Sequence, residues 1–434
     1  MAKHAKLGPS STERWMNCPG SVPLSEGLLD ESSRYAAEGT AAHFLAAYCL
    51  TSKTEPEDYK GREILLCVTP DGEHFEAFCP VGNNSLITDQ FMVEDEMVRA
   101  IDTYVSDIRR VALAVNGDLH VEQRLSISHL TKEEDAAGTS DVVICAPDKL
   151  IVVDLKYGQG VRVEAEGNKQ LLMYAAAAYE KFGLIYDFKS VQLVIHQPRL
   201  DAVSEYSYSL EELEQFTQSV KVSVENVTKA VEAYEAGAED FSEYLHPSED
   251  ACRWCKAKAI CPALADRVSQ ELGEMFEDLS EAQKTEEGVK ARVESIDVEA
   301  LSLKAKSIEL IEMFCKAVRG KVESLLLLGI AVPDFKLVQG KKGHRTWKNA
   351  EEAEAMMRSM RLKEAEMYNR KLISPTDADK LLKKDSPKRW QRIVPLIEQR
   401  VGSPSVAPMS DKREALTMTH VADEMEDLTD GLLG

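Results

Sequence analysis

Long apolar runs are missing from this sequence. No segment has the roughly 20 consecutive apolar residues that span a bilayer, and residues 1–6 lack the apolar stretch of a secretory signal peptide. We therefore expect a protein without membrane contact that works in the reducing cytoplasm. Cysteine in that compartment is expected to stay reduced or to bind metal.

Positive charge is also scarce. The chain has 52 Lys and Arg against 74 Asp and Glu, a net charge of -22, which argues against binding nucleic acid over the whole surface. Residues 336–400 are the exception, with 17 basic and 9 acidic side chains, or 17 minus 9 = +8. This basic region could steer nucleic acid to one place, although solvated helix faces would explain it equally well.

Acidic side chains accompany two expected strands. The apolar run at residues 150–153 predicts a buried strand that ends in Asp154, Leu155 and Lys156. Alternation along a strand puts Asp154 and Lys156 on one face and turns Leu155 into the core. A preceding strand at residues 141–145 and a short turn would form a hairpin that brings Asp141 near Asp154. Taken alone, the Asp-x-Lys triplet is much more often a surface salt bridge on a hairpin than a metal site, and the surrounding motifs reverse this preference.

Two converging carboxylates predict a bound cation, because like charges repel unless an ion neutralises them. Hard oxygen ligands favour Mg²⁺ or Mn²⁺. Such an ion can activate water and stabilise charge on a phosphodiester, and Lys156 would orient that water.

Other motifs occur in a characteristic order. They are His43 in the Gly-Thr-x-x-His context of an expected helix, Glu122 on an alternating segment, and Gln170 and Tyr174 four residues apart on an apolar helix. With Asp141, Asp154 and Lys156, this order resembles the RecB-like branch of the PD-(D/E)XK nuclease superfamily.

The resemblance implies a role for each matched residue. His43, Asp141 and Asp154 would bind the metal together with the main-chain carbonyl of Leu155, and Glu122 would supply a further acid. Lys156 would assist the attacking water. Gln170 and Tyr174 would contact DNA.

The nine cysteines include one metal-binding pattern. Cys252, Cys255 and Cys261 have ligand spacing but lack a fourth partner, for which Cys18 is the natural candidate. RecB-like nucleases of the iron-sulfur type place one Cys before the core and three after it, which implies a [4Fe-4S] cluster. Zinc is the alternative occupant, and free thiols or a disulfide are further interpretations of the same residues.

The expected fold is α/β, with a restriction-endonuclease-like mixed sheet flanked by helices, a four-cysteine cluster and a mostly helical C-terminal extension. We expect four regions: a nuclease domain at 1–262, a helical arm at 263–330, a small basic α+β region at 331–401 and a mobile acidic tail at 402–434. Within the first, residues up to about 115 are expected to be helical. Within the third, residues 333–348 are expected to form a β-hairpin with a basic tip.

The whole chain further resembles an uncharacterised family common in phage and prophage genomes. The resemblance rests on the Trp-x-x-Cys-Pro-Gly start, the Asp-Leu-Lys-Tyr-Gly strand end and the Cys triplet. That family is associated with replication and recombination genes, which implies an Mg²⁺- or Mn²⁺-dependent DNA exonuclease in the host cytoplasm. Its partners would be single-stranded or duplex DNA ends and a single-strand-binding or recombination protein.

Two other functions stay open from the sequence. One is a non-catalytic DNA- or protein-binding accessory module that keeps the nuclease fold. The other is a zinc-stabilised scaffold built on the C-terminal helices. Strand polarity and oligomeric state have no signal in the residues.

Overall fold

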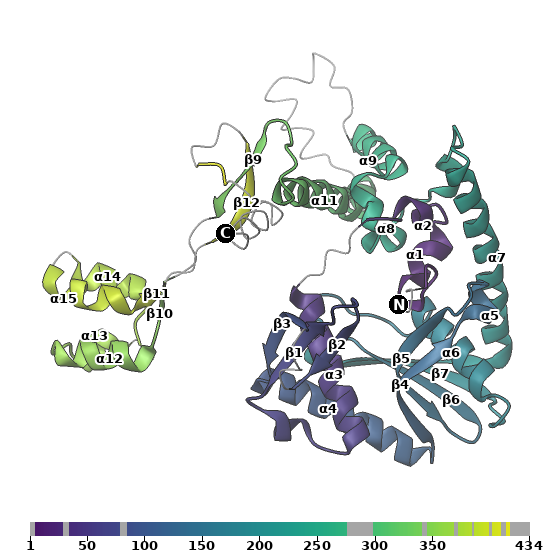
Figure 1. Cartoon of the computed structure of the whole chain (residues 1–434), viewed down its shortest axis with the longest axis horizontal. Coiled ribbons are helices and arrows are strands. Elements are labelled where there is room, and N and C mark those ends of the chain that lie inside the picture. The colour runs from purple at the N-terminus through teal and green to yellow at the C-terminus, as the bar shows by residue number, and fades with distance from the viewer. Residues whose placement is uncertain are drawn as a thin grey trace, which may run out of the picture. The chain divides into compact units, whose positions relative to one another are not determined.

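The chain forms two compact units, residues 1–314 and 315–434. The structure is a computed structural model, shown in Figure 1. It describes residues 5–28, 34–78, 85–275, 298–340, 345–368, 372–383, 386–398, 402–408 and 414–416. No helix in these ranges combines the length and the apolar character that crossing a bilayer requires.

A five-stranded mixed sheet forms the centre of the first unit. Its strands are β4 (Asp118–Ser126), β5 (Ala137–Cys145), β6 (Lys149–Leu155), β7 (Ser190–Gln197) and β8 (Ala202–Ser209), in the order β4-β5-β6-β7-β8. Strands β6 and β7 are parallel and the other neighbours are antiparallel. The short turn after Cys145 makes β5 and β6 a hairpin, as the sequence predicts, and the expected α/β class with a mixed sheet is confirmed.

Helices cover both faces of this sheet (Figure 1). Helices α6 (Lys169–Phe182) and α7 (Leu210–Glu235) pack on one face, and α3 (Arg34–Ser52) and α4 (Asp95–Ala114) on the other. Local sequence sets where α6 and α7 begin. The Asn168 side chain caps the first turn of α6, and Ser209 with Glu212 forms a capping box at the start of α7.

The expectation of an all-helical segment up to residue 115 is wrong. Strands β1 (Glu63–Val68), β2 (His74–Ala77) and β3 (Leu86–Met92) form a second, antiparallel sheet in the order β2-β1-β3. Strands β2 and β3 have no fully buried residue, so they lack the apolar run that marks a strand in sequence.

The chain ends of the first unit meet. The short helices here are α1 (Thr12–Asn17), α2 (Ser21–Leu24), α8 (Glu249–Arg253) and α9 (Pro262–Met275). The Gly20 amide donates to the Tyr244 carbonyl at 2.8 Å, and Cys18, Cys252, Cys261 and Leu264 share one buried cluster. Residues far apart in sequence are therefore neighbours around the cysteines. This packing carries the first unit past residue 262, the boundary expected from sequence.

The second unit combines short strands with helices. Its elements are β9 (Phe335–Gly340), β10 (Thr346–Trp347), α12 (Ala350–Ser359), α13 (Glu364–Met367), α14 (Pro375–Leu382), α15 (Pro387–Ile393), β11 (Ile397–Glu398) and β12 (Gly402–Pro408). Helix α11 (Val298–Leu327) crosses the boundary between the two units, and the short helix α5 (Ser128–Thr131) belongs to the first unit.

The hairpin predicted at residues 333–348 is not formed. Strand β9 pairs with β12 and strand β10 pairs with β11, so each takes a partner from beyond residue 396. Residues 402–408, expected to be a mobile tail, therefore form a paired strand. The basic tip at 341–344 and the end of the tail at 417–434 lie outside the described residues.

Candidate active site

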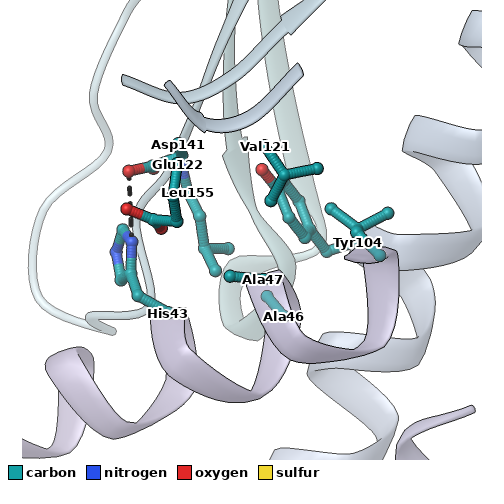
Figure 2. Close-up of a pocket in the computed structure, with 9 residues that line it drawn as sticks. His43, Ala46, Ala47, Tyr104, Val121, Glu122, Asp141 and Leu155 are labelled. Carbon is teal, nitrogen blue, oxygen red and sulfur yellow. Dashed lines mark hydrogen bonds and ion pairs between the residues drawn. The ribbon is translucent and has the colours of Figure 1, made fainter. Parts of the chain in front are cut away.

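Three side chains from separate elements converge beside the central sheet. His43 lies on α3, Glu122 on β4 and Asp141 on β5, and their ligand atoms all lie within 4.8 Å of one another. Figure 2 shows His43 and Asp141 in contact, with Glu122 beside them. One nitrogen and two carboxylates at this spacing could hold a divalent cation.

Asp141 is fixed by a contact on each of its oxygens. Its Oδ1 lies 3.3 Å from His43 Nδ1, and its Oδ2 accepts the Leu155 amide at 2.7 Å. Burial alone would raise the pKa of Asp141, but the His43 charge and these hydrogen bonds hold it below its usual range. Burial lowers the pKa of His43, but the charge and hydrogen bond of Asp141, together with the charges of Asp154 and Glu122, outweigh this effect and raise the pKa to about 9. Without metal, the two side chains therefore form an ion pair.

Glu122 has an unusual backbone. Val121 pairs with Val142 and Gln123 pairs with Ser140, so Glu122 stands opposite Asp141. Its φ of 47° lies in the left-handed region, which costs a residue with a Cβ roughly 1–2 kcal/mol. Strain of this kind within a strand is typical of functional sites.

The side-chain alternation of β4 changes at this residue. Leu119 and Val121 pack into the core under α3 and α4. Leu125 and Ile127 pack into the opposite core, under α6 and α7. All four are odd-numbered, so simple alternation would put them on one face. The reversal falls between Val121 and Leu125, where Glu122 has its left-handed conformation.

Electrostatic strain accompanies the backbone strain. Desolvation, and then the charge of Asp141, raise the pKa of Glu122 to about 7, although its side chain keeps contact with solvent. Glu76 on β2 lines the same opening and has a pKa raised by burial. Neighbouring carboxylates repel one another, and a bound cation would stabilise their charged forms.

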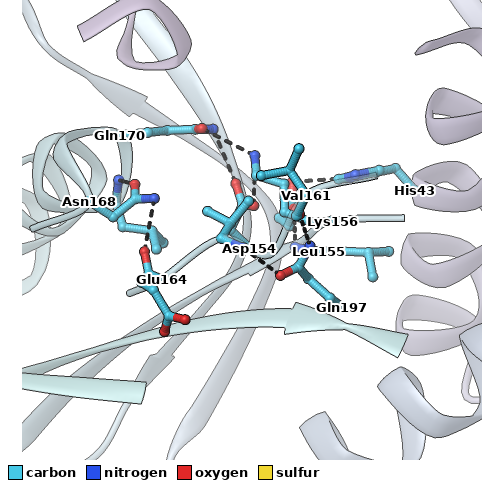
Figure 3. A network of polar contacts seen from close by, with 12 residues as sticks. His43, Asp154, Leu155, Lys156, Val161, Glu164, Asn168, Gln170 and Gln197 are labelled. Atoms are coloured by element: carbon cyan, nitrogen blue, oxygen red, sulfur yellow. Dashed lines mark hydrogen bonds and ion pairs between the residues drawn. The ribbon is translucent and has the colours of Figure 1, made fainter. Parts of the chain in front are cut away.

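Asp154, Lys156 and Gln170 form a closed ring of polar contacts next to this group (Figure 3). Lys156 Nζ lies 2.9 Å from Asp154 Oδ2 and donates to Gln170 Oε1 at 3.2 Å. Gln170 Nε2 donates to Asp154 Oδ1 at 3.1 Å. Burial and the charge of Asp141 raise the pKa of Asp154. Desolvation lowers the pKa of Lys156, but the charge and hydrogen bond of Asp154, together with the charge of Asp141, outweigh it and raise that pKa.

A part-buried pair, His196 with Asp107, holds the main chain of Lys156 at the end of the sheet. The Lys156 amide donates to the His196 carbonyl at 2.9 Å. The His196 ring is buried, and its Nε2 lies 3.1 Å from Asp107 Oδ2 on α4. Helix α4 thereby fixes the end of β7, and β7 fixes the backbone at Lys156.

The hydroxyl of Tyr104 is a further buried polar group beside the site. Its side chain is 1% exposed, and its hydroxyl has no hydrogen-bond partner among the described residues. It lines a small pocket with His43, Glu122, Asp141 and Leu155 (Figure 2). The free volume is about 10 Å³, which is close to the room needed for one water molecule.

The four predicted cluster cysteines also lie together. Cys18, Cys252, Cys255 and Cys261 are all buried, and the His246 amide donates to Cys18 Sγ at 3.3 Å. Burial raises the pKa of Cys18, and the neighbouring Cys255 and Cys261 raise it further. Among the described residues, only the His43 group brings three ligand atoms within 4.8 Å of one another, so no three of these thiols come that close together. Direct zinc bonds of about 2.3 Å would require closer sulfurs.

The predicted site residues thus fall into two adjacent groups. His43, Glu122 and Asp141 converge, and Leu155 lines their pocket. Asp154 is not in that group, because both its oxygens face Lys156 and Gln170. Tyr174 is 7% exposed, interacts with the Gln170 side chain of the ring and also borders a larger groove.

Sequence reasoning missed two members of the site. Glu76 lies on one of the unexpected short strands, and no motif surrounds it. Tyr104 lies on the amphipathic helix α4, where a buried aromatic is indistinguishable from a core residue. Only the tertiary structure brings either one to His43.

Comparison with known protein families matches almost the whole chain. The family model DUF2800, described as a protein of unknown function, matches residues 4–414. The chain therefore belongs to the DUF2800 family.

Proposed function

We propose that this protein is a metal-dependent DNA nuclease of the RecB-like PD-(D/E)XK type. The observation that carries the proposal is the convergence of His43, Glu122 and Asp141 within 4.8 Å, beside a buried Asp154–Lys156 pair. A binding surface alone has no need to bury acids whose repulsion requires a cation. The mixed sheet with the hairpin β5–β6 is compatible with this nuclease class.

The donor set fits a manganese or magnesium ion. Two carboxylates suit either metal, and the imidazole of His43 favours manganese. The Leu155 amide donates to Asp141 Oδ2, and Oδ1, which contacts His43 Nδ1, would bind the ion in place of the His43 proton. Asp154 would join after its carboxylate turns from Lys156. A bound ion would lower the pKa of a water molecule and stabilise charge on a phosphodiester.

Lys156 and Gln170 would prepare the attacking water. Lys156 is held by Asp154 and by the main-chain bond to His196, so its ammonium stays next to the acids. Once Asp154 turns, Lys156 Nζ is free to hold a water deprotonated, and Gln170 keeps the lysine in line through its Oε1.

The four cysteines support a [4Fe-4S] cluster as part of the proposal. All four thiols are buried, which would give the cluster an apolar surrounding. Sulfurs that lie further apart than the ligands of a single zinc ion would suit the larger iron-sulfur core. The cluster would stabilise the closed arrangement of the chain ends rather than enter the reaction.

The proposed biological setting is end processing of DNA in the cytoplasm during replication or recombination. The resemblance to RecB-like nucleases implies exonuclease action on single-stranded or duplex ends. A single-strand-binding or recombination protein would be the natural partner.

The direct experiment follows degradation of end-labelled linear DNA with Mn²⁺, with Mg²⁺ and with EDTA. We expect metal-dependent degradation by the wild type and its loss in Asp154→Asn and Lys156→Gln. Asp148→Asn, in the β5–β6 turn, serves as the control that keeps activity. Equal inactivity of all proteins over a range of ends would contradict the proposal.

One observation favours a second function. Asp154 pairs with Lys156 and accepts a hydrogen bond from Gln170 without metal, as expected of a module that binds DNA or protein without cutting. Metal-independent binding with no product would support this alternative.

A further inference from the structure

Trp254 is exposed where tryptophan is normally buried. Its side chain is 78% exposed, whereas its neighbours Cys252 and Cys255 are buried. Trp254 follows the last residue of α8. The two inward cysteines fix the backbone on either side, so the loop presents a large apolar ring to solvent from a constrained base. A single exposed ring is ordinary on a protein surface, but one held on a constrained base beside a groove is well placed to stack on a planar ligand.

The indole lines a groove that reaches toward the candidate active site. The groove has a volume of about 1200 Å³, and its walls include Trp254, Lys256, Arg124, Thr139 and Tyr174. Arg124 on β4 pairs with Thr139 on β5. These positions are two residues along each strand from Glu122 and Asp141. The groove therefore joins the cysteine loop to the strands that carry the acids.

We propose that this groove binds single-stranded nucleic acid and that Trp254 stacks on one of its bases. The inference deepens the proposed nuclease function and rests on it for the identity of the ligand. A base in a single strand offers a free apolar face to an exposed ring, whereas a base in a duplex is already stacked on its neighbours. The groove is thus specific for unpaired strands or frayed ends.

The charges in the groove indicate that stacking dominates over phosphate contacts. Lys6 pairs with Glu26 at 2.7 Å, and Glu13 pairs with Lys169 at 2.8 Å. The other charged side chains in the walls, apart from histidine, are of both signs: Arg14, Arg124, Lys256, Glu73, Asp135 and Asp250. Few counterions would be released on binding. We expect a slope of log affinity against log salt of about -2 or shallower.

The test measures binding of fluorescently labelled oligothymidine and oligoadenine by anisotropy in EDTA, so that no cleavage occurs. We expect Trp254→Ala to weaken binding about tenfold or more, the usual loss of one stacked base, and Trp254→Phe to retain most of it. Ile260→Ala is the matched control, because Ile260 lies in the same cysteine segment, is 50% exposed and does not line the groove. Iron content and visible absorbance check that each variant keeps its fold.

The outcomes separate this inference from the nuclease proposal. Unchanged oligonucleotide affinity in Trp254→Ala would overturn the stacking role even if the protein cuts DNA. Equal loss in Trp254→Ala, Trp254→Phe and Ile260→Ala would also overturn it, because the effect would then be structural. Trp254-dependent binding without cleavage in any metal would support the groove and contradict the nuclease proposal.

Discussion

Glu122 stands opposite Asp141 across strands β4 and β5 and holds a left-handed backbone with φ of 47°. The two carboxylates, with His43, come within 4.8 Å of one another. Like charges directly opposite on antiparallel strands are destabilising, and so is the backbone conformation. The metal-free protein therefore carries a charge repulsion that a cation would relieve, in addition to the backbone strain.

Removing the side chain at position 122 should reveal the backbone strain. Glu122→Gly relieves both the left-handed strain and the repulsion by Asp141, whereas Glu122→Ala relieves only the repulsion. We expect the glycine variant to have a free energy of unfolding about 1 kcal/mol higher than the alanine variant. Urea unfolding in EDTA measures the difference. Equal stability of the two variants would show that the backbone is unstrained.

Lys156→Met should destabilise the protein in a way that metal repairs. The change leaves the buried Asp154 carboxylate with Gln170 alone, and we expect a loss of about 2 kcal/mol in EDTA. Saturating Mn²⁺ should shrink this loss, because the ion replaces the lysine charge. Thermal unfolding with and without Mn²⁺ gives the comparison. Lys132→Met, which breaks an exposed pair with Glu225, should cost little in either condition, and an unaltered Lys156→Met loss in Mn²⁺ would count against an ion near Asp154.

Tyr104→Phe should weaken metal binding without lowering the stability of the metal-free protein. The Tyr104 hydroxyl is buried without a partner among the described residues, so its removal should leave the metal-free protein unchanged or up to about 1 kcal/mol more stable. Because the hydroxyl lines the pocket beneath His43 and Asp141, Mn²⁺ should bind more weakly, as measured by calorimetry.

Tyr59→Phe is the matched control for that experiment. The Tyr59 hydroxyl donates to Thr54 Oγ1 at 3.0 Å, away from the site. Its loss should cost about 1 kcal/mol and leave Mn²⁺ affinity intact. Stability changes of the same sign in both variants would contradict a functional role for the Tyr104 hydroxyl.

Cys18→Ala should remove the proposed cluster although Cys18 is distant in sequence from the other three cysteines. We expect loss of iron and of visible absorbance in anaerobically purified protein, together with a lower melting temperature. Cys49→Ala removes a buried thiol from α3 and should keep the iron and the visible absorbance. Retention of bound zinc without iron in the wild type would favour the zinc alternative instead.

Much of the central fold could be predicted because its elements have strong local signals. The apolar run of β6, the capping box at the start of α7 and the apolar face of α6 each identify one element without tertiary information. The short turn between β5 and β6 predicts that Asp141 and Asp154 lie close together. The parallel pairing of β6 with β7 follows from the intervening helix.

The remainder depends on contacts that no local pattern encodes. Strands β2 and β3 are short and half-exposed, so the sheet that brings Glu76 to the site could not be recognised. Strand β9 pairs with β12 rather than with β10, and this partner comes from more than 60 residues away. The turning of Asp154 toward Lys156 and Gln170 depends on α6 packing against β6, which sequence spacing does not specify.

Hydrolysis of labelled linear DNA by wild type and Asp141→Asn tests the central claim most directly. Asp141 contacts His43 and stands opposite Glu122, and asparagine keeps its shape while removing the charge that would hold the cation. We predict Mn²⁺-dependent release of nucleotides by the wild type, abolished by EDTA and reduced at least about a hundredfold in Asp141→Asn. Nuclease activity that persists in EDTA or in Asp141→Asn would contradict the account.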